Sequence, residues 1–317
     1  DNSHVAPPGT FSTGYHLTED LFDQAIQFIA SHEATIPDHP WMTLIGLGAC
    51  HAPHQAPKEL ISHYDSMFRR GWDTERSERL ARQISLGIVP PETQLPPRND
   101  FVEAWNQLDD ITRQVATRLQ AAYAAMLHHS DLHLARLVDH LELSGQIDNT
   151  VIMVLSDNGA SQEGGPLGFV NAMGPYNGLP ESMEAKFDRI DDIGGPDTHS
   201  NFPWGWAMTA NTPLRRYKQN THGGGVRDPL VVHWPRKITQ PGLRDQFCHA
   251  SDIVPTLLDF IKVAAPEKIN GVQQKPIEGI SFASTLTDRY AQTGKTTQYF
   301  EMFGHRGLVH DGWKAVA

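Results

Sequence analysis

The chain has 317 residues, enough for about two domains or for one large α/β domain with an appendage. Its 26 Lys and Arg residues against 37 Asp and Glu residues give a net charge of −11, which argues against a nucleic-acid binder because phosphate recognition needs a basic face. The chain has only two cysteines, which excludes a disulfide framework but leaves one disulfide bridge open. No apolar run approaches the roughly 20 residues of a membrane helix, so no membrane span is predicted.

Helical periodicity predicts three helices in the first half of the chain. Apolar residues recur at helical spacing after Thr18, a candidate N-cap, and again in a longer stretch that Gly145 closes as a candidate C′ residue. The longer stretch has a candidate break near residues 128–130. The predicted helices cover residues 18–30, 74–84 and 101–143.

Apolar runs predict the strands. The run from Trp41 to Gly48 predicts a buried strand. The continuous run Val151–Leu155 predicts a central parallel strand, because a strand that is covered on both faces is apolar throughout. Further predictions are strands at 229–234 and 297–302, a helix at 251–262, and a hairpin at 308–316 with an Asp-Gly turn.

The order of these elements predicts an α/β fold in which helices flank a mixed sheet. Residues 1–280 are expected to form this α/β domain, and residues 281–317 are expected to begin a small antiparallel C-terminal subdomain. Residues 156–228 lack periodicity, and such a long irregular stretch inside a folded chain is usually functional. The chain opens without Met, a basic n-region or an apolar h-region, so no targeting segment is visible, and either a segment has been removed or the chain is a piece of something longer.

Asp157 and Asn158 form the first candidate site. They follow the strand predicted at 151–155, and in open α/β sheets ligands bind at the carboxyl ends of strands. An adjacent carboxylate and amide offer two hard oxygens to a divalent cation. Ca²⁺ and Mg²⁺ take about six or more ligands, so the rest would have to come from elsewhere. The simpler interpretation is that Ser156-Asp157-Asn158-Gly159 is a turn.

His51 forms the second candidate site, directly after the strand predicted at 41–48. An imidazole at a strand end can act as a general acid or donate to an anion. The simpler interpretation is a solvated loop histidine. A zinc site with His54 is not expected, because the two histidines lack the i, i+4 spacing of a helical pair.

Lys218 and His222 form the third candidate site. Three glycines, Gly223 to Gly225, follow them and allow the backbone to approach a bound group closely, while the two basic side chains can deliver positive charge to an oxyanion. The order of residues is not that of a P-loop. The alternative is a flexible glycine-rich turn with incidental basic residues.

Six ordered motifs give the chain a family resemblance. It resembles sulfatases of the large arylsulfatase type, which belong to the alkaline-phosphatase superfamily, and the resemblance extends over almost the whole chain. The matching segments are Gly48–Pro53, Val154–Gly165, Gly205–Ala207 with Asn211–Lys218, Thr221–Pro229 with His233–Pro235, Ser251–Leu258 and Pro276–Phe282.

The resemblance implies an alkaline-phosphatase-like fold and the hydrolysis of a small-molecule sulfate ester. It implies that Asp157 and Asn158 are ligands of Ca²⁺, or of Mg²⁺ as in some members. It further implies that His51 lies near the leaving-group oxygen, that Lys218 offsets charge on the sulfate oxygens, and that His222 is a further active-site histidine. In the family, the hydrate of a formylglycine attacks the sulfur.

The chain departs from the family pattern at the nucleophile. Formylglycine arises from a Cys or Ser in a C/S-x-P-x-R motif, and this motif does not occur in the sequence. The strand that carries two adjacent aspartate ligands is missing too. The sequence thus resembles the carboxyl-terminal part of a sulfatase, with the formylglycine expected in the missing segment, and this chain alone is expected to be inactive.

Two other readings of the chain stay open. In the first, the chain is a non-catalytic fragment or a degenerate homologue. In the second, it is a phosphatase or phosphonate hydrolase of the same superfamily. No nucleic-acid or membrane partner is expected. The sequence does not fix the oligomeric state or distinguish a cytoplasmic from a periplasmic location.

Overall fold

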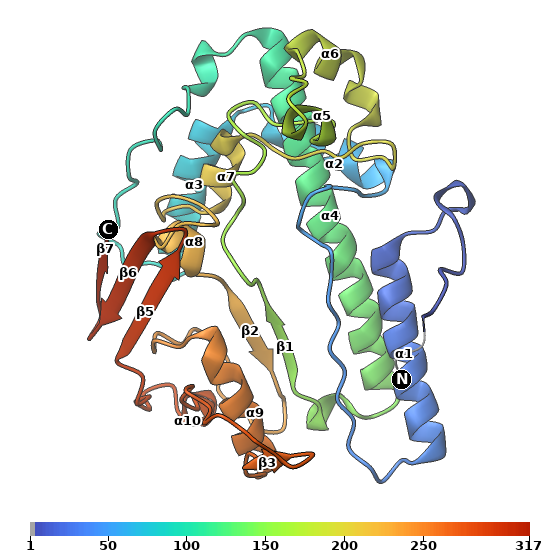
Figure 1. Cartoon of the computed structure of the whole chain (residues 1–317), viewed down its shortest axis with the longest axis vertical. Helices are drawn as coiled ribbons and strands as arrows, with labels where there is room; N and C mark the ends of the chain where they lie inside the picture. The colour runs from blue at the N-terminus through green and yellow to red at the C-terminus, as the bar shows by residue number, and fades with distance from the viewer. Residues whose placement is uncertain (1–3) are drawn as a thin grey trace.

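Long helices form one side of the molecule in this computed structural model, which describes residues 4–317 (Figure 1). The longest, α4 (Asp110–Leu143), packs against α1 (Leu17–Thr35) and α2 (Lys58–Phe68). Its first turn is capped by Asp109, whose carboxylate accepts a hydrogen bond from the Thr112 backbone at 2.7 Å. Residues 1–3 lie outside the described part of the chain, so the structure does not bear on the interpretation of the opening residues.

The helix predictions were correct in type and inexact in their ends. Helix α1 begins at Leu17 with His16, not Thr18, as its N-cap, and it ends five residues beyond the predicted Ala30. Helix α4 starts at Asp110 rather than 101 and runs without a break past 128–130, where the Ser130 hydroxyl donates to the Met126 carbonyl inside the helix (3.0 Å). Gly145 has φ +72°, as expected of a C′ residue.

The prediction of a central parallel strand is wrong. Strand β1 (Ile152–Leu155) pairs in antiparallel orientation with β2 (Leu230–His233), with Ile152 opposite His233, and these two form a sheet of their own. Leu155 is 46% exposed, so the strand is not covered on both faces. A continuous apolar run indicates burial in a larger sheet, and no further strand lies beside this pair among residues 4–317.

The prediction of a buried strand at Trp41–Gly48 is also wrong. The segment has no strand partner in the described chain. Trp41 and Ile45 pack against the cluster between α1 and α4, whereas Met42 and Leu44 are 81% and 88% exposed. The segment is therefore apolar on both sides and covered on one.

The C-terminal sheet agrees closely with its prediction. Strands β5 (Thr297–Met302), β6 (His305–His310) and β7 (Trp313–Val316) form an antiparallel meander. Asp311 and Gly312 have φ of +45° and +82°, the left-handed pair that a tight hairpin turn requires. Before this sheet lie α9 (Ile253–Ile261), β3 (Lys268–Ile269), β4 (Val272–Gln273) and α10 (Ala283–Thr287).

A cluster of tryptophans forms the core next to the irregular segment 156–228. Trp72 of α3 (Trp72–Ser85), Trp105 and Trp206 of α7 (Trp204–Ala210) meet edge to face, with centroids 4.8–5.9 Å apart. Gly205 allows this packing, because a Cβ there would lie 2.4 Å from the Trp72 ring. The remaining short helices are α5 (Met173–Tyr176), α6 (Met183–Asp188), α8 (Gly223–Val226) and the 3-10 turns 11–13, 105–107, 147–149, 190–192 and 250–252.

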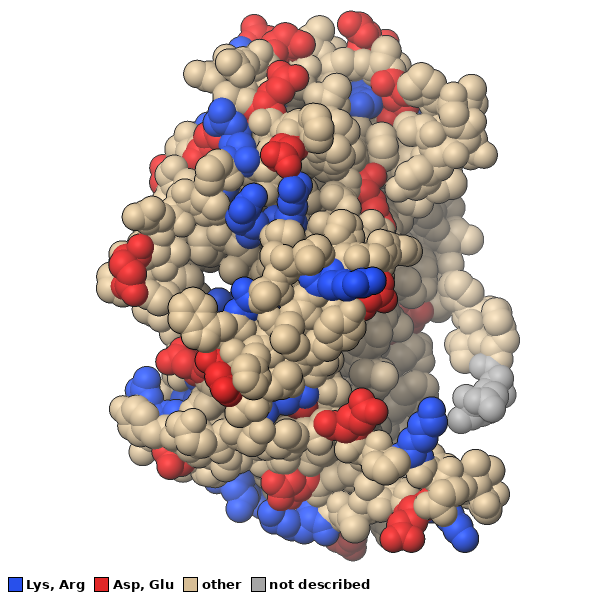
Figure 2. Space-filling view, turned by 60° about the vertical axis from the view of Figure 1, so that its left-hand side comes forward, with Lys and Arg blue, Asp and Glu red and all other residues tan. Residues whose placement is uncertain are grey.

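Basic and acidic side chains are interspersed on the face that Figure 2 shows. Cys50 and Cys248 are free. Within residues 4–317, every helix is too short or too polar to cross a bilayer.

Candidate functional site

Three loops meet and carry the candidate residues. The loop with His51 is fastened by His54, whose backbone N–H donates to the Ser200 carbonyl while the Ser200 hydroxyl donates to the His54 carbonyl, both at 3.0 Å. The His54 ring is buried against Phe202, and burial lowers its pKa to about 3. His54 is therefore a neutral structural residue.

Asn211 joins the loop after β1 to the loop that carries Lys218. Its side-chain oxygen accepts from the Ala160 backbone (2.9 Å), and its amide donates to the Arg216 carbonyl (3.0 Å). The Lys218 backbone N–H donates to the Ala160 carbonyl at 3.0 Å. These bonds hold the loop after β1 and the loop of Lys218 side by side.

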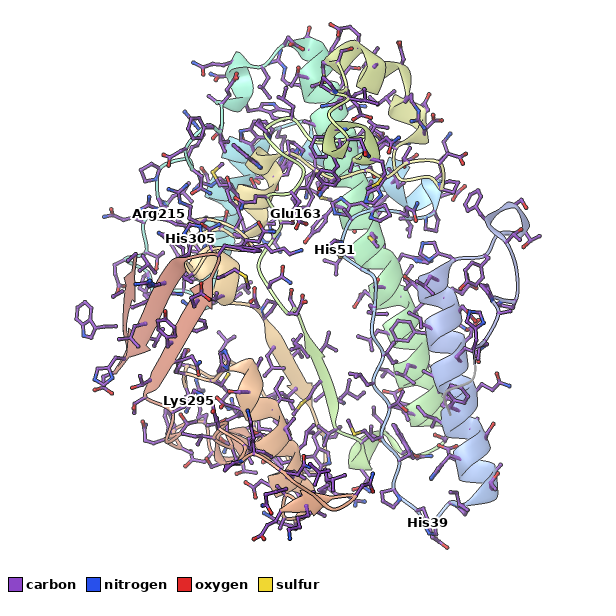
Figure 3. All side chains as sticks on the ribbon, in the orientation of Figure 1. His39, His51, Glu163, Arg215, Lys295 and His305 are labelled. Atoms are coloured by element: carbon purple, nitrogen blue, oxygen red, sulfur yellow. The ribbon has the colours of Figure 1, made fainter. Side chains whose placement is uncertain are left out.

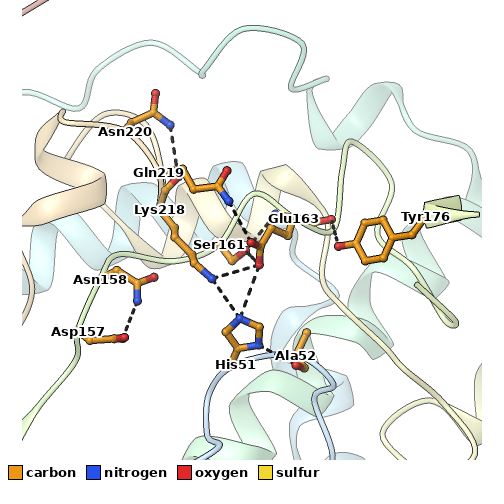
Figure 4. A network of polar contacts seen from close by, with 10 residues as sticks. All are labelled: His51, Ala52, Asp157, Asn158, Ser161, Glu163, Tyr176, Lys218, Gln219 and Asn220. Atoms are coloured by element: carbon orange, nitrogen blue, oxygen red, sulfur yellow. Dashed lines mark hydrogen bonds and ion pairs between the residues drawn. The ribbon is translucent and has the colours of Figure 1, made fainter. Parts of the chain in front are cut away.

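Lys218, His51 and Glu163 form one contact network (Figure 4), and Figure 3 shows where His51 and Glu163 lie in the fold. Lys218 Nζ lies 3.1 Å from His51 Nε2 and donates to Glu163 Oε2 at 3.3 Å, and His51 Nε2 lies 3.8 Å from the same oxygen. His51 Nδ1 lies 2.7 Å from the Ala52 carbonyl, which only accepts. Nδ1 is therefore the protonated nitrogen, and Nε2 of the neutral ring accepts from Lys218.

Glu163 is a residue of this network that sequence reasoning missed. Its carboxylate also accepts from Ser161 (3.0 Å) and Gln219 (3.1 Å). The available signal was its place in the Glu-Gly-Gly end of the motif at 154–165. The carboxylate holds the ammonium in place, and together Lys218 and His51 present one cation and one imidazole to the same space.

Asp157 and Asn158 lie beside this network without a hydrogen bond to it (Figure 4). The Asn158 amide donates to the Asp157 carboxylate at 2.6 Å. In the described part of the chain, no three His, Cys, Asp or Glu side chains gather in a way that could hold a metal ion. The pair offers two oxygen ligands and does not make a complete site for Ca²⁺ or Mg²⁺.

Asp228 is a second nearby carboxyl group that the sequence reasoning did not select. Burial, followed by the charge of Asp157, raises its pKa to about 7, while Lys314 of β7 acts in the opposite direction. The region around Asp157 therefore includes a carboxyl group that titrates near neutral pH and a lysine from the C-terminal sheet.

His222 lies apart from the Lys218–His51 contact. Burial and, after it, the basic side chains of Arg216, Arg215, Lys314 and His305 lower its pKa. Its Nδ1 is enclosed and has no hydrogen-bond partner among residues 4–317. Of the five predicted site residues, His51 and Lys218 thus touch each other, Asp157 and Asn158 touch each other, and His222 faces a separate group of basic side chains.

Two protein families match the sequence. The sulfatase family matches residues 2–263, and the C-terminal family of N-sulphoglucosamine sulphohydrolase matches residues 217–314. An uncharacterized sulfatase of Schizosaccharomyces pombe is 29% identical, over 99% of this chain and 54% of its own. The arylsulfatase of Klebsiella aerogenes is 26% identical, over 81% of this chain and 54% of its own. The chain thus spans about half the length of these curated relatives.

Solved structures show the same fold at low sequence identity. One is described as a complex of BT4656 with its substrate D-glucosamine-2-N,6-O-disulfate, at 15% identity and a TM-score of 0.54 over 95% of this chain and 60% of that chain. Another, Ps i-CgsB in complex with k-i-k-neocarrahexaose, is 18% identical with a TM-score of 0.53, over 95% of this chain and 46% of that chain.

Proposed function

Because the chain belongs to the sulfatase family, we propose that it contributes His51, Lys218, Asp157 and Asn158 to a site that hydrolyses sulfate esters. The contact of Lys218 Nζ with His51 Nε2 carries this proposal. It brings a cation and a proton-transferring ring from sequence-distant loops to one point, as the hydrolysis of an anionic ester requires. The proposed substrate is a small-molecule sulfate ester, of the aryl sulfate type.

Lys218 is the proposed partner of the sulfate oxygens. Its side chain is 20% exposed and is held by Glu163, so it is pre-positioned for charge that develops on those oxygens. His51 is the proposed donor to the leaving-group oxygen. Once Lys218 turns to the sulfate, His51 Nε2 no longer accepts from it and can take up a proton from solvent, and the imidazolium then gives that proton to the leaving-group oxygen. The loss of either group costs roughly 3 kcal/mol of barrier.

Asp157 and Asn158 are the proposed contribution of this chain to a Ca²⁺ site, with Mg²⁺ as the alternative ion. Members of the family generally use a divalent metal and a formylglycine. Such a metal would polarise the sulfate, and the formylglycine would supply the nucleophile. Both need groups beyond those described here, since only two ligands are at hand and the sequence has no C/S-x-P-x-R motif.

The absence of that motif favours a second candidate, a non-catalytic fragment or degenerate homologue. A phosphatase or phosphonate hydrolase ranks lower, because those enzymes usually hold a second metal with extra His and Asp ligands. Hydrolysis of 4-nitrophenyl sulfate by the purified 317-residue chain would contradict the non-catalytic candidate.

The proposed function is tested with the protein expressed from the complete gene. We expect Lys218→Ala and Asp157→Ala each to lower kcat/KM for 4-nitrophenyl sulfate by at least about a hundredfold. Lys275→Ala, at an exposed lysine of the same chain, is the matched control and should leave kcat/KM unchanged. Activity that survives both site substitutions undiminished would contradict the proposal.

A further inference from the structure

Three polar side chains next to the loop of Lys218 are buried without a hydrogen-bond partner. They are Arg76 of α3, Asn99 in the segment between α3 and α4, and Tyr217, which directly precedes Lys218, and each is at most 8% exposed. The atoms without a partner among residues 4–317 are Arg76 Nε, Asn99 Nδ2 and the Tyr217 hydroxyl oxygen. All three carry hydrogens that they can donate. Because a buried donor without an acceptor is costly, this group indicates a ligand that accepts hydrogen bonds.

Backbone contacts bring the three side chains together. Helix α3 packs beside α7 (Figure 1), and from α3 the Arg76 Nη2 atom donates to the Pro96 carbonyl at 3.0 Å. Three residues further along the chain, Asn99 Oδ1 accepts from the Arg216 backbone N–H at 3.4 Å, so that Tyr217 follows directly after this contact. Burial raises the pKa of Tyr217, whereas Asn99 and Arg76 lower it, which agrees with their place beside the phenol.

Arg76 is a buried cation without a carboxylate partner. The Asp73 carboxylate is paired with Arg98 at 3.1 Å. The Asp100 carboxylate is paired with Arg216 at 3.0 Å. Within residues 4–317, no carboxylate lies within ion-pair distance of Arg76, and burial lowers its pKa although the charge of Asp73 opposes this effect. Three guanidinium groups against two carboxylates leave one positive charge over, and a buried charge needs a partner, so one monovalent anion matches the excess.

We propose that Arg76, Asn99 and Tyr217 bind one chloride ion. Chloride accepts hydrogen bonds, has none to donate and carries a single negative charge, so it suits a group of donors with one positive charge in excess. A water molecule adds no charge and leaves the guanidinium unpaired. A dianion such as sulfate exceeds the positive charge that is available.

The chloride ion stabilises the backbone that leads into Lys218. With Nδ2 turned to the ion, the Asn99 amide keeps Oδ1 toward the Arg216 N–H. Arg216 has φ +66°, a left-handed conformation that a residue other than glycine holds only when its surroundings fix it. The C-terminal sheet covers the same loop at another point, where a Cβ on Gly307 would lie 3.0 Å from Thr221 Cβ. The loop is thus held by the sheet and by the chloride site.

Urea unfolding of the 317-residue protein tests the site. The comparison is between sodium chloride and sodium gluconate at the same ionic strength, so that screening of charges stays constant. Chloride at about 100 mM should lower the unfolding equilibrium constant about tenfold and saturably, as for a Kd of about 10 mM. Crystals grown in sodium bromide should show an anomalous peak within hydrogen-bond distance of Arg76 Nε. An unfolding constant that depends on ionic strength alone would overturn the proposal.

Two variants assign the effect to the buried group. Asn99→Asp places a carboxylate of the protein beside Arg76, so this variant should be equally stable in gluconate and in chloride. Tyr217→Phe removes one donor and should weaken chloride binding about tenfold, which leaves only about a twofold effect of chloride on the unfolding constant. Arg82→Met, at an exposed arginine of the same helix, is the matched control and should keep the wild-type response. A full wild-type response in Asn99→Asp would overturn the assignment.

Lys218→Ala separates the chloride site from the proposed function. The measurement follows unfolding and not hydrolysis, so it does not depend on whether sulfate esters are substrates. Lys218→Ala removes the proposed partner of the sulfate oxygens and should keep the wild-type response to chloride. If the response disappears in Lys218→Ala and persists in Tyr217→Phe, chloride binds at Lys218, and the site at Arg76 is overturned.

Discussion

His133 Nε2 lies 3.1 Å from His129 Nε2 on the face of α4 that meets α1. Arg136 donates to His133 Nδ1 at 2.7 Å, so the neutral His133 ring carries its proton on Nε2 and donates it to His129. The His129 proton is then on Nδ1. If His129 takes a second proton, two N–H groups face each other, and if His133 does, an N–H faces the guanidinium.

This pair predicts that the protein loses stability in acid. Burial, then the neighbours His16, His133 and His128, lowers the pKa of His129 to about 4, and the residue is 6% exposed. Burial and Arg136 also lower the pKa of His133, against Glu19 and Asp23 of α1. An unfolded histidine titrates near 6.5, so the unfolded chain binds more protons, and stability falls as pH decreases from about 6.5 to about 4. For His129 the loss reaches about 3 kcal/mol.

Urea unfolding at pH 7 and pH 4.5 measures this loss. His129→Gln should reduce the difference between the two pH values, because the buried titrating group is gone. His39→Gln, at an exposed histidine, is the control and should keep the wild-type difference. An equal pH dependence in wild type and His129→Gln would contradict the prediction.

A second prediction concerns the tautomer of His51. Its Nδ1 faces the Ala52 carbonyl at 2.7 Å, so the neutral ring should be the Nδ1–H form. Long-range ¹H–¹⁵N NMR of the imidazoles above pH 8 distinguishes the two tautomers. His133, predicted to be the Nε2–H form, is the internal reference. An Nε2–H signal for His51 would remove Lys218 as its donor.

A third prediction concerns the buried ion pair between Lys295 and Asp252. Their side chains are 7% and 1% exposed, the charged atoms are 3.2 Å apart, and the carboxylate also accepts from the Ile280 backbone at 2.9 Å. Lys295→Met should cost about 3 kcal/mol of unfolding free energy, because it leaves a buried charge without its partner. Denaturant titration at pH 7 measures this cost.

Lys262→Met is the control for that substitution. It breaks the Lys262–Asp259 pair, which has a similar distance (2.9 Å) but is 81% and 44% exposed. The expected cost is below about 1 kcal/mol. If both variants lose the same stability, burial does not set the strength of these pairs.

A fourth prediction concerns the apolar surface of the segment 41–48. Exposed Met42 and Leu44, next to a backbone without strand partners, should lead the isolated chain to self-associate. Met42→Lys/Leu44→Lys should weaken self-association about tenfold in sedimentation velocity. Phe101→Lys/Leu143→Lys, at two other exposed apolar residues, is the matched control. A wild-type chain that stays monomeric at all concentrations would contradict the prediction.

Elements with local signals were predicted well. The Asp311-Gly312 turn determines the β6–β7 hairpin by its own dihedral preferences, and the periodicity of α4 and its end at Gly145 are local too. The motifs also predicted the sulfatase family and the mixed α/β fold, both of which are confirmed. Helix α2 was missed, although its apolar residues recur at helical spacing from Leu60 to Phe68.

Strand pairing could not be predicted from the same signals. Val151–Leu155 and Trp41–Gly48 are apolar runs, and such a run records how much burial a segment suits but not which neighbour supplies it. The contact of His51 with Lys218 links residues 167 positions apart, and Glu163 joins them only through the fold. The sequence therefore predicted the members His51 and Lys218, while the carboxylate between them needed the structure.

The contact of Gly307 with Thr221 bears on where this protein can be divided. The two family matches overlap at residues 217–263. The contact joins Thr221, inside this overlap, to Gly307 of the C-terminal sheet. A polypeptide that ended at residue 280 would keep the loop of Lys218 and His222 but would uncover its Thr221 side. Expression trials and deletion studies should therefore retain the final meander, which serves as a wall of the loop rather than as a dispensable tail.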